Sequence, residues 1–184
     1  MTMTNRLFLT ALLLGSPVVV LAQPTTATDV TQAEIQAVFD TIGRSVDKQI
    51  KIVDIGQKAN VAVGILHRGA MSTEGATVSG IVHHDVTEVY YILSGGGTLV
   101  TGGSVEITRQ WDPASGVVQD LVGPSASANT ADGRSREVGE GDIVVIPAGV
   151  FHAFSHIDDH VSYLSIRVDP DQVLPAGYVN PVLE

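Results

Sequence analysis

The sequence predicts an all-β protein, a sandwich or barrel of short strands with one helix near the N-terminus. Three observations support this prediction. Short runs rich in β-branched residues recur along the chain, glycine-rich turns separate most of them, and only one segment has clear helical spacing. Many short strands with regular turns are typical of β-sandwiches and β-barrels.

Residues 1–22 have the pattern of a secretory signal peptide. A short basic start precedes an almost wholly apolar run, and Val20-Leu21-Ala22 places small residues where signal peptidase cleaves. Gly15-Ser16-Pro17 interrupts the apolar run, which leaves it shorter than the roughly 20 residues that span a bilayer. We therefore expect cleavage after Ala22 and a periplasmic or secreted protein.

Composition narrows the partners of the chain. There is no cysteine, so stability has to come from packing and from any bound metal rather than from disulfides. The formal net charge of −10 argues against nucleic acid and against anionic membrane surfaces as partners. We expect a soluble protein with a small-molecule substrate and no membrane contact once the signal is removed.

Residues 23–45 are expected to form a tether and a helix. Gln23–Val30 is polar and has no apolar period, whereas Thr31 and Glu34 have the spacing of a capping box. Four apolar residues then follow at helical spacing, namely Ile35, Val38, Phe39 and Ile42. This stripe predicts a helix over 31–42 that packs on the outside of a sheet.

The β-domain is expected to cover residues 46–184. A turn at Gly56–Asn60 and a hairpin turn at Ser94–Gly97 separate predicted strands, and the long segment 111–137 is expected to be an excursion beside the barrel mouth. Strands are predicted at Ile50–Ile55, Val61–His67, Thr77–His83, Glu88–Leu93, Thr98–Thr101, Val105–Thr108, Asp142–Ile146, Val150–Ser155 and Ser162–Val168.

Two segments about fifty residues apart carry the candidate metal ligands. In the first, His84 and Glu88 share a face of a regular strand, whereas His83 points away unless a bulge brings it round. In the second, His152 follows the tight turn at 147–149. Two imidazoles and one carboxylate are a typical ligand set for a divalent metal with open positions. Parity with Glu88 favours His84 over His83 as the third ligand.

Both segments resemble the two motifs of the cupin superfamily, which consists of small jelly-roll barrels. The pattern Gly-x5-Pro-x-Gly-x2-His is met in full by Gly141, Pro147, Gly149 and His152. The other motif is met in part, because Glu88 and Gly95 fit but one of its two histidine positions is apolar here. Depending on the register, those positions fall on Ile81 and His83 or on Val82 and His84.

The resemblance implies a double-stranded β-helix, or jelly-roll barrel, with a divalent ion held by His152, Glu88 and His84 or His83. Fe²⁺ or Mn²⁺ is favoured, with Zn²⁺ or Ni²⁺ as alternatives. It also implies an enzyme acting on a small organic molecule, with an oxygenase placed before an isomerase or lyase. A non-catalytic barrel that binds metal or a small ligand is the rival hypothesis, and a homodimer is expected from the resemblance alone.

Several other residues are weaker candidates. Glu88 could act as a general base, and Tyr90 could orient a substrate or simply pack in the wall. Arg167 lies in an apolar strand, so it either pairs with an anion such as a substrate carboxylate or lies on an exposed face. His67 is a further candidate ligand, although a surface or core role is the simpler interpretation, and His156 and His160 are expected to be solvated. Val82, Tyr90, Ile92, Val145 and Phe154 are expected to form apolar walls.

Overall fold

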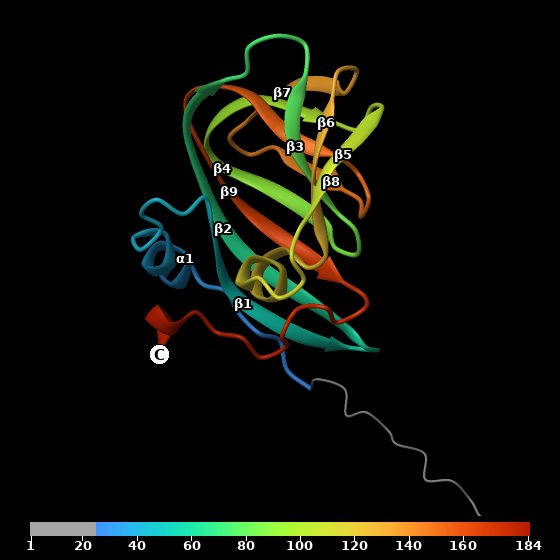
Figure 1. The fold of residues 1–184 in the computed structure, drawn as a ribbon. Coiled ribbons are helices and arrows are strands. Elements are labelled where there is room, and N and C mark those ends of the chain that lie inside the picture. Colours follow the sequence, from blue (N-terminus) through green and yellow to red (C-terminus); the bar gives the residue numbers. More distant parts are fainter. Residues whose placement is uncertain (1–24) are drawn as a thin grey trace, which may run out of the picture.

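A computed structural model describes residues 25–184, and the predicted signal peptide lies outside them. The chain forms an antiparallel β-barrel with one short α-helix (Figure 1). Its elements are α1 (Gln32–Phe39), β1 (Asp47–Gly56), β2 (Ala59–Ser72), β3 (Val78–His83), β4 (Thr87–Thr101), β5 (Val105–Gln110), the π-helical turn η1 (Val117–Val122), β6 (Ser125–Thr130), β7 (Arg134–Gly139), β8 (Ile143–Ile146), β9 (His152–Asp169) and the 3₁₀ turn η2 (Pro181–Leu183). The predicted all-β class with one N-terminal helix is confirmed.

The long strand β9 organises the barrel. It pairs with β2 and β4 along most of its length, and its first residue, His152, pairs with Ile81 of β3. The sheet continues from β3 through β6 to β5, while β4 also pairs with β7 and β8. Because β9 begins at His152 and pairs with both β3 and β4, it brings together the two segments that carry the candidate ligands.

The helix forms as its sequence predicts. Thr31 accepts a hydrogen bond from the backbone N–H of Glu34, whose carboxylate in turn accepts from the N–H of Thr31. Val38 is fully buried and packs with Ile50 of β1 and Ile65 of β2. The helix therefore covers the outer side of the sheet. None of the helices in residues 25–184 is long and apolar enough to cross a membrane.

The predicted hairpin turn at Ser94–Gly97 is wrong, because β4 runs through these residues as one irregular strand. The pairing of β4 with β9 shifts register around Ser94 and Thr98. A Cβ at Gly95 or Gly97 would collide with backbone carbonyls of β9, and one at Gly96 with a carbonyl of β7. The glycines thus permit close approach of neighbouring strands at bulges rather than a chain reversal.

The predicted loop at 111–137 is also largely wrong. It contains η1 and the strands β6 and β7, and β6 lies between β3 and β5. The small and polar residues of β6 hide this strand from a propensity argument, yet four of its six residues are buried. Only the part around η1 lies beside the barrel mouth. Similarly, the strands predicted separately at Val150–Ser155 and Ser162–Val168 belong to one continuous strand, because β9 runs from His152 to Asp169.

Candidate metal centre and cavity

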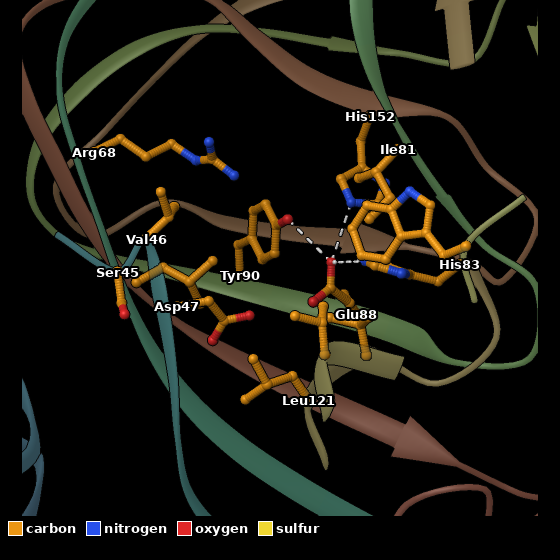
Figure 2. Close-up of a pocket in the computed structure, with 14 residues that line it drawn as sticks. Ser45, Val46, Asp47, Arg68, Ile81, His83, Glu88, Tyr90, Leu121 and His152 are labelled. Atoms are coloured by element: carbon orange, nitrogen blue, oxygen red, sulfur yellow. Dashed lines mark hydrogen bonds and ion pairs between the residues drawn. The ribbon is translucent and has the colours of Figure 1, made fainter. Parts of the chain in front are cut away.

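Three buried side chains, His83, Glu88 and His152, form the only group in residues 25–184 that could hold a metal ion. His83 ends β3, Glu88 lies near the start of β4, and His152 opens β9. Their exposed fractions are 4%, 2% and 4%. Oε2 of Glu88 lies 3.3 Å from Nε2 of His83 and 3.2 Å from Nε2 of His152 (Figure 2). These three atoms therefore converge on one point.

The hydrogen bonds behind His83 set its tautomer. Its Nδ1 lies 2.8 Å from the hydroxyl of Ser125, and that hydroxyl donates its own hydrogen to the carbonyl of Gly123 at 2.9 Å. Because the single hydroxyl hydrogen is used in this way, the Ser125 oxygen accepts from His83 and Nδ1 carries a hydrogen. The neutral ring then presents an unprotonated Nε2 to Glu88.

His152 is oriented in the same manner. Its Nδ1 lies 3.1 Å from the backbone carbonyl of Val150, and a carbonyl oxygen only accepts. Nδ1 of His152 therefore carries a hydrogen, which leaves Nε2 as the bare nitrogen of the neutral ring. The turn that precedes it is held by Gly149, whose φ is +79° and whose N–H donates to the carbonyl of His83 at 2.7 Å. The same turn thus links the two imidazole-bearing segments.

The two oxygens of Glu88 have different partners. Oε1 accepts from Ser165 Oγ at 2.6 Å and from Arg167 Nε at 3.0 Å, whereas Oε2 faces the histidines. Burial by itself would raise the pKa of Glu88, but hydrogen bonds that His152 and His83 donate when their rings are protonated, together with the charge of Arg167, hold that pKa well below the usual value. Burial lowers the pKa of His83 despite the neighbouring carboxylate. The cluster is thus an ionised carboxylate beside an imidazole that favours its neutral form.

This donor set fits a divalent metal ion. With hydrogens on both Nδ1 atoms, two nitrogen lone pairs face one carboxylate oxygen at 3.2–3.3 Å. Only a cation or additional protons between these atoms turns that arrangement into an attraction. Neutral imidazoles anchored through the far nitrogen and an ionised carboxylate are the forms that bind metal. Two imidazoles and one carboxylate leave coordination positions open.

The preference for His84 over His83 fails in this structure. β3 ends at His83 and β4 begins at Thr87, so His84 and Glu88 do not share a strand and parity does not relate them. His84 is exposed, and its Nε2 lies 3.0 Å from Gln110. Ile81, on the same face of β3 as His83, lines the cavity where a further imidazole of the cupin pattern would stand. The cluster therefore offers three ligands.

Tyr90 supports the cluster from inside the barrel. Its hydroxyl donates to Oε2 of Glu88 at 3.0 Å. Burial, followed by the charge of Glu88, raises the pKa of Tyr90 well above its usual value, so the phenol remains a donor. Its ring lies against Tyr163, with centroids 4.4 Å apart. Tyr90 thus touches both the carboxylate and the cavity wall.

Arg167 is a fully buried internal partner rather than a substrate-binding or exposed residue. Besides Glu88, it donates to Gln49 from Nη1 at 2.8 Å and to Asp47 from Nη2. The expected anion partner is therefore supplied by the protein itself. Oδ1 of Asp47 is the one buried side-chain polar atom in residues 25–184 without a hydrogen bond. Burial raises the pKa of Asp47 although Arg167 opposes this.

The other histidines lie away from the cluster. His67 contacts Ser162 through Nδ1 at 2.9 Å and packs edge-on against Phe39 of α1, so it has a structural role under the helix. His156 is exposed as expected, and His160 is partly buried beside Ser94.

The three candidate metal ligands line a cavity of about 320 Å³. A second chamber of about 250 Å³ adjoins it. Arg68, Ile81, Tyr90, Trp111 and His152 line both chambers. Residues of η1 cover one side of the first chamber. Asp47, Arg68 and Trp111 were not among the site residues that the sequence predicted.

Of the predicted apolar walls, Tyr90 and Phe154 line a chamber, whereas Val82 and Ile92 belong to the packed core. Val145 is 62% exposed, because the inward positions of β8 are Val144 and Ile146. For Arg68 a signal did exist in the sequence, since it shares strand parity with the inward-facing Leu66.

Comparisons with known proteins show likeness of fold at low identity. A scan of family models gave no match to this chain, and no curated protein sequence matches it. A solved protein from Bacillus halodurans aligns over 87% of this chain and 93% of its own, at 15% identity and a TM-score of 0.43. A cupin protein from Bacteroides fragilis aligns over 72% and 86%, at 22% identity and a TM-score of 0.36. Hydroxypropylphosphonic acid epoxidase from S. wedmorenis aligns over 65% and 55%, at 8% identity and a TM-score of 0.38.

At such low identities and TM-scores, none of these structures carries an argument about what this chain does. The class of protein follows from the chain itself. Antiparallel strands close around a His–Glu–His cluster, and the Gly141–His152 motif supplies one of its imidazoles. The chain therefore has an antiparallel β-barrel fold with this cluster inside, and two of the similar structures are a cupin protein and a protein with a double-stranded β-helix domain.

Proposed function

We propose that this protein is a metal-dependent cupin-type enzyme that holds a divalent ion at His83, Glu88 and His152. The observation that carries the proposal is the orientation of the two imidazoles. Each is anchored through Nδ1, so that two bare Nε2 atoms and Oε2 of Glu88 face one point. Imidazole and carboxylate in this ratio suit Fe²⁺ or Mn²⁺, and the same donors also accept Zn²⁺ or Ni²⁺.

When bound, such an ion would supply Lewis acidity and open coordination positions for dioxygen or a substrate oxygen. The remaining work falls to residues of the chain. The apolar walls bind a small organic molecule and exclude water, and the hydroxyl of Tyr90 donates a hydrogen bond to Oε2 of Glu88. A carboxylate whose pKa is held low is a weak base, which favours a ligand role for Glu88 over general-base catalysis. We therefore propose an oxygenase-type reaction.

A second candidate is a barrel that binds metal or a small ligand without turnover. The observation in its favour is Ile81, which places an alkyl side chain where the cupin pattern has another imidazole. Isomerase or lyase chemistry would use the same ligands.

The test is metal content followed by turnover. The protein is reconstituted separately with iron, manganese, nickel and zinc, and bound metal is measured by elemental analysis in wild type, His83→Ala, Glu88→Gln and His152→Ala. His84→Ala is the matched control, because it removes an adjacent exposed imidazole. We expect one ion per chain in wild type and the control, and loss in the other variants. Metal-free wild type under every condition contradicts the proposal.

Oxygen uptake by the loaded protein then separates the two candidates. Uptake that depends on an added organic substrate supports the enzyme. Stoichiometric metal with no uptake and no conversion of any compound across a broad panel supports the binding protein.

Export and pairing are separate proposals. We propose that the chain is exported and cleaved after Ala22, which predicts a mature N-terminus at Gln23 by mass spectrometry. We also propose a homodimer, which size-exclusion chromatography with light scattering would detect. A monomeric mass, or an uncleaved chain in the cytoplasmic fraction, contradicts the respective proposal.

A further inference from the structure

Arg68 places a positive charge in the wall of the cavity. It lies on β2 and lines both chambers, as do Tyr90 and the candidate ligand His152. Figure 2 shows its guanidinium directed toward the side of the cavity where Tyr90 and His152 lie. The residue is only partly buried, so its charge meets the open space rather than a packed core.

The outer nitrogens of this guanidinium have no acceptor within residues 25–184. Nε donates to the hydroxyl of Tyr163 at 3.1 Å, and no hydrogen bond or ion pair there involves Nη1 or Nη2. The guanidinium of Arg167 is different, because each of its three nitrogens donates to a protein acceptor. Arg68 therefore presents an unused pair of donors, a fork whose geometry matches a carboxylate.

Contacts between aromatic rings connect this fork to the candidate metal centre. Tyr163, which fixes Nε of Arg68, is fully buried and packs on Tyr90 with ring centroids 4.4 Å apart. Tyr90 in turn donates to Glu88 at 3.0 Å. A molecule bound by Arg68 and lying along these two rings would extend toward the His–Glu–His cluster.

The local charge favours an anion. Arg167 pairs with two carboxylates, Glu88 and Asp47, so Arg68 carries the one positive charge in the cavity lining that no ion pair of residues 25–184 uses. A divalent ion at the cluster would add to the Arg68 guanidinium and make the cavity positive, although the chain as a whole carries −10. The rest of the lining is mostly apolar, with Ile81, Leu99 and Trp111 among its members.

We propose that Arg68 binds the carboxylate of a small monocarboxylic acid whose apolar body occupies the cavity. The claim that the far end of this acid reaches the metal rests on the function proposed above, whereas the carboxylate site itself does not. Chambers of about 320 and 250 Å³ suit a body the size of one aromatic ring or a short alkyl chain.

The binding test uses the only tryptophan of the chain as its probe. Trp111 lines both chambers, so its fluorescence reports occupancy. Benzoate and hexanoate are titrated into the protein against their neutral isosteres benzamide and hexanamide, with and without reconstituted metal. The variants are Arg68→Gln, Arg68→Lys and, as a control for net charge, Arg134→Gln, an exposed residue of β7 outside both chambers.

We expect at least one acid to bind wild type and the Arg134 control more tightly than its amide. In Arg68→Gln the Kd of the acid should rise about 10- to 100-fold, the loss expected for a charge-assisted, two-point contact, while that of the amide changes little. Arg68→Lys should restore part of the affinity because it keeps the charge but not the fork. Acids that bind no better than amides, or equally well to Arg68→Gln, overturn the proposal.

Two further readouts distinguish a binding role of Arg68 from a purely structural one. If Arg68 had only a structural role through its bond to Tyr163, Arg68→Gln would lower the melting temperature and weaken acid and amide alike, which contradicts the proposal. Metal content of Arg68→Gln should equal that of wild type. Absent metal with Arg68-dependent acid binding would reject the proposed enzyme but retain this site, whereas normal metal without acid binding would reject this site alone.

Discussion

Arg167 donates from Nε to Oε1 of Glu88 at 3.0 Å, and this bond divides the carboxylate between a structural oxygen and a functional one. Oε1 is held by buried donors, so Oε2 is left to face His83 and His152. The arrangement makes Glu88 both an ion-pair partner in the core and a candidate ligand. Its replacement should therefore affect folding and metal binding together, whereas other changes separate the two.

Arg167→Met should destabilise the protein strongly. The change leaves the buried carboxylates of Glu88 and Asp47 without their cation, and breaking a buried pair in this way typically costs about 3–5 kcal/mol. The free energy of unfolding is measured by urea denaturation. Lys51→Met is the control, since it breaks a more exposed pair with Glu34 and should cost roughly 1 kcal/mol or less. Equal losses in the two variants would contradict the network described for Arg167.

Ser125→Ala should weaken metal binding without removing a ligand. The change leaves Nδ1 of His83 without its acceptor, and loss of such an outer contact typically lowers metal affinity about 10- to 100-fold. The affinity is measured by competition with a chromophoric chelator. Ser79→Ala, which removes a hydroxyl bonded to Asn129 on the same strand pair, should leave it unchanged. An unaltered affinity in Ser125→Ala would mean that the tautomer of His83 is set in another way.

Gly80→Ala should disturb the position of His152. A Cβ at Gly80 would lie 2.5 Å from the carbonyl oxygen of His152, so β3 and β9 would have to separate. Overpacking of this kind costs about 1–3 kcal/mol, and metal affinity should fall with it. Gly69→Ala is the matched control, because its Cβ would meet nothing within 4 Å. Thermal unfolding of both variants decides the matter, and equal melting temperatures would show that the close approach is unimportant.

The metal-free protein should lose stability on both sides of neutrality. Since the pKa of His83 is lowered, the unfolded chain takes up a proton there first as pH falls below about 6.5, which costs stability. Glu88 adds a loss of the same sign below about pH 4.5, and Asp47, whose pKa is raised, offsets part of it. Above about pH 10 the unfolded chain loses its Tyr90 proton first, and stability falls again.

Urea midpoints measured from pH 4 to 11 in the presence of a chelator test this profile. His83→Gln should flatten the limb just below pH 6.5 and leave the alkaline limb unchanged. A wild-type midpoint that stays constant from pH 7 down to pH 4 would contradict the assignments.

The features that the sequence predicted correctly are mostly those formed by residues close together in the chain. The capping box of Thr31 and Glu34 acts over a few residues, and so does the Pro147–Gly149 turn that precedes His152. Glu88 was predicted from motif spacing. The capping box and the turn formed as expected because each is closed by hydrogen bonds between residues three apart in the chain.

The remaining features depend on distant partners. Gly95–Gly97 resembles a turn until the carbonyls of β9 and β7 are in place, and Ser125–Thr130 resembles a loop until β3 and β5 pair with it. The choice between His83 and His84 depends on where β3 ends, which no alternation pattern could give. Arg68 gains its significance only from a cavity that residues of several strands enclose.

The central claim is that His83, and not its neighbour His84, completes a metal site with Glu88 and His152. Calorimetric titration of Zn²⁺ into metal-free wild type, His83→Ala and His84→Ala tests it most directly. We expect one tight site in wild type and in His84→Ala, and a loss of affinity in His83→Ala that exceeds the roughly 100-fold upper effect of an outer contact. Equal affinity in wild type and His83→Ala, or no Zn²⁺ binding by the folded wild type, would contradict the account.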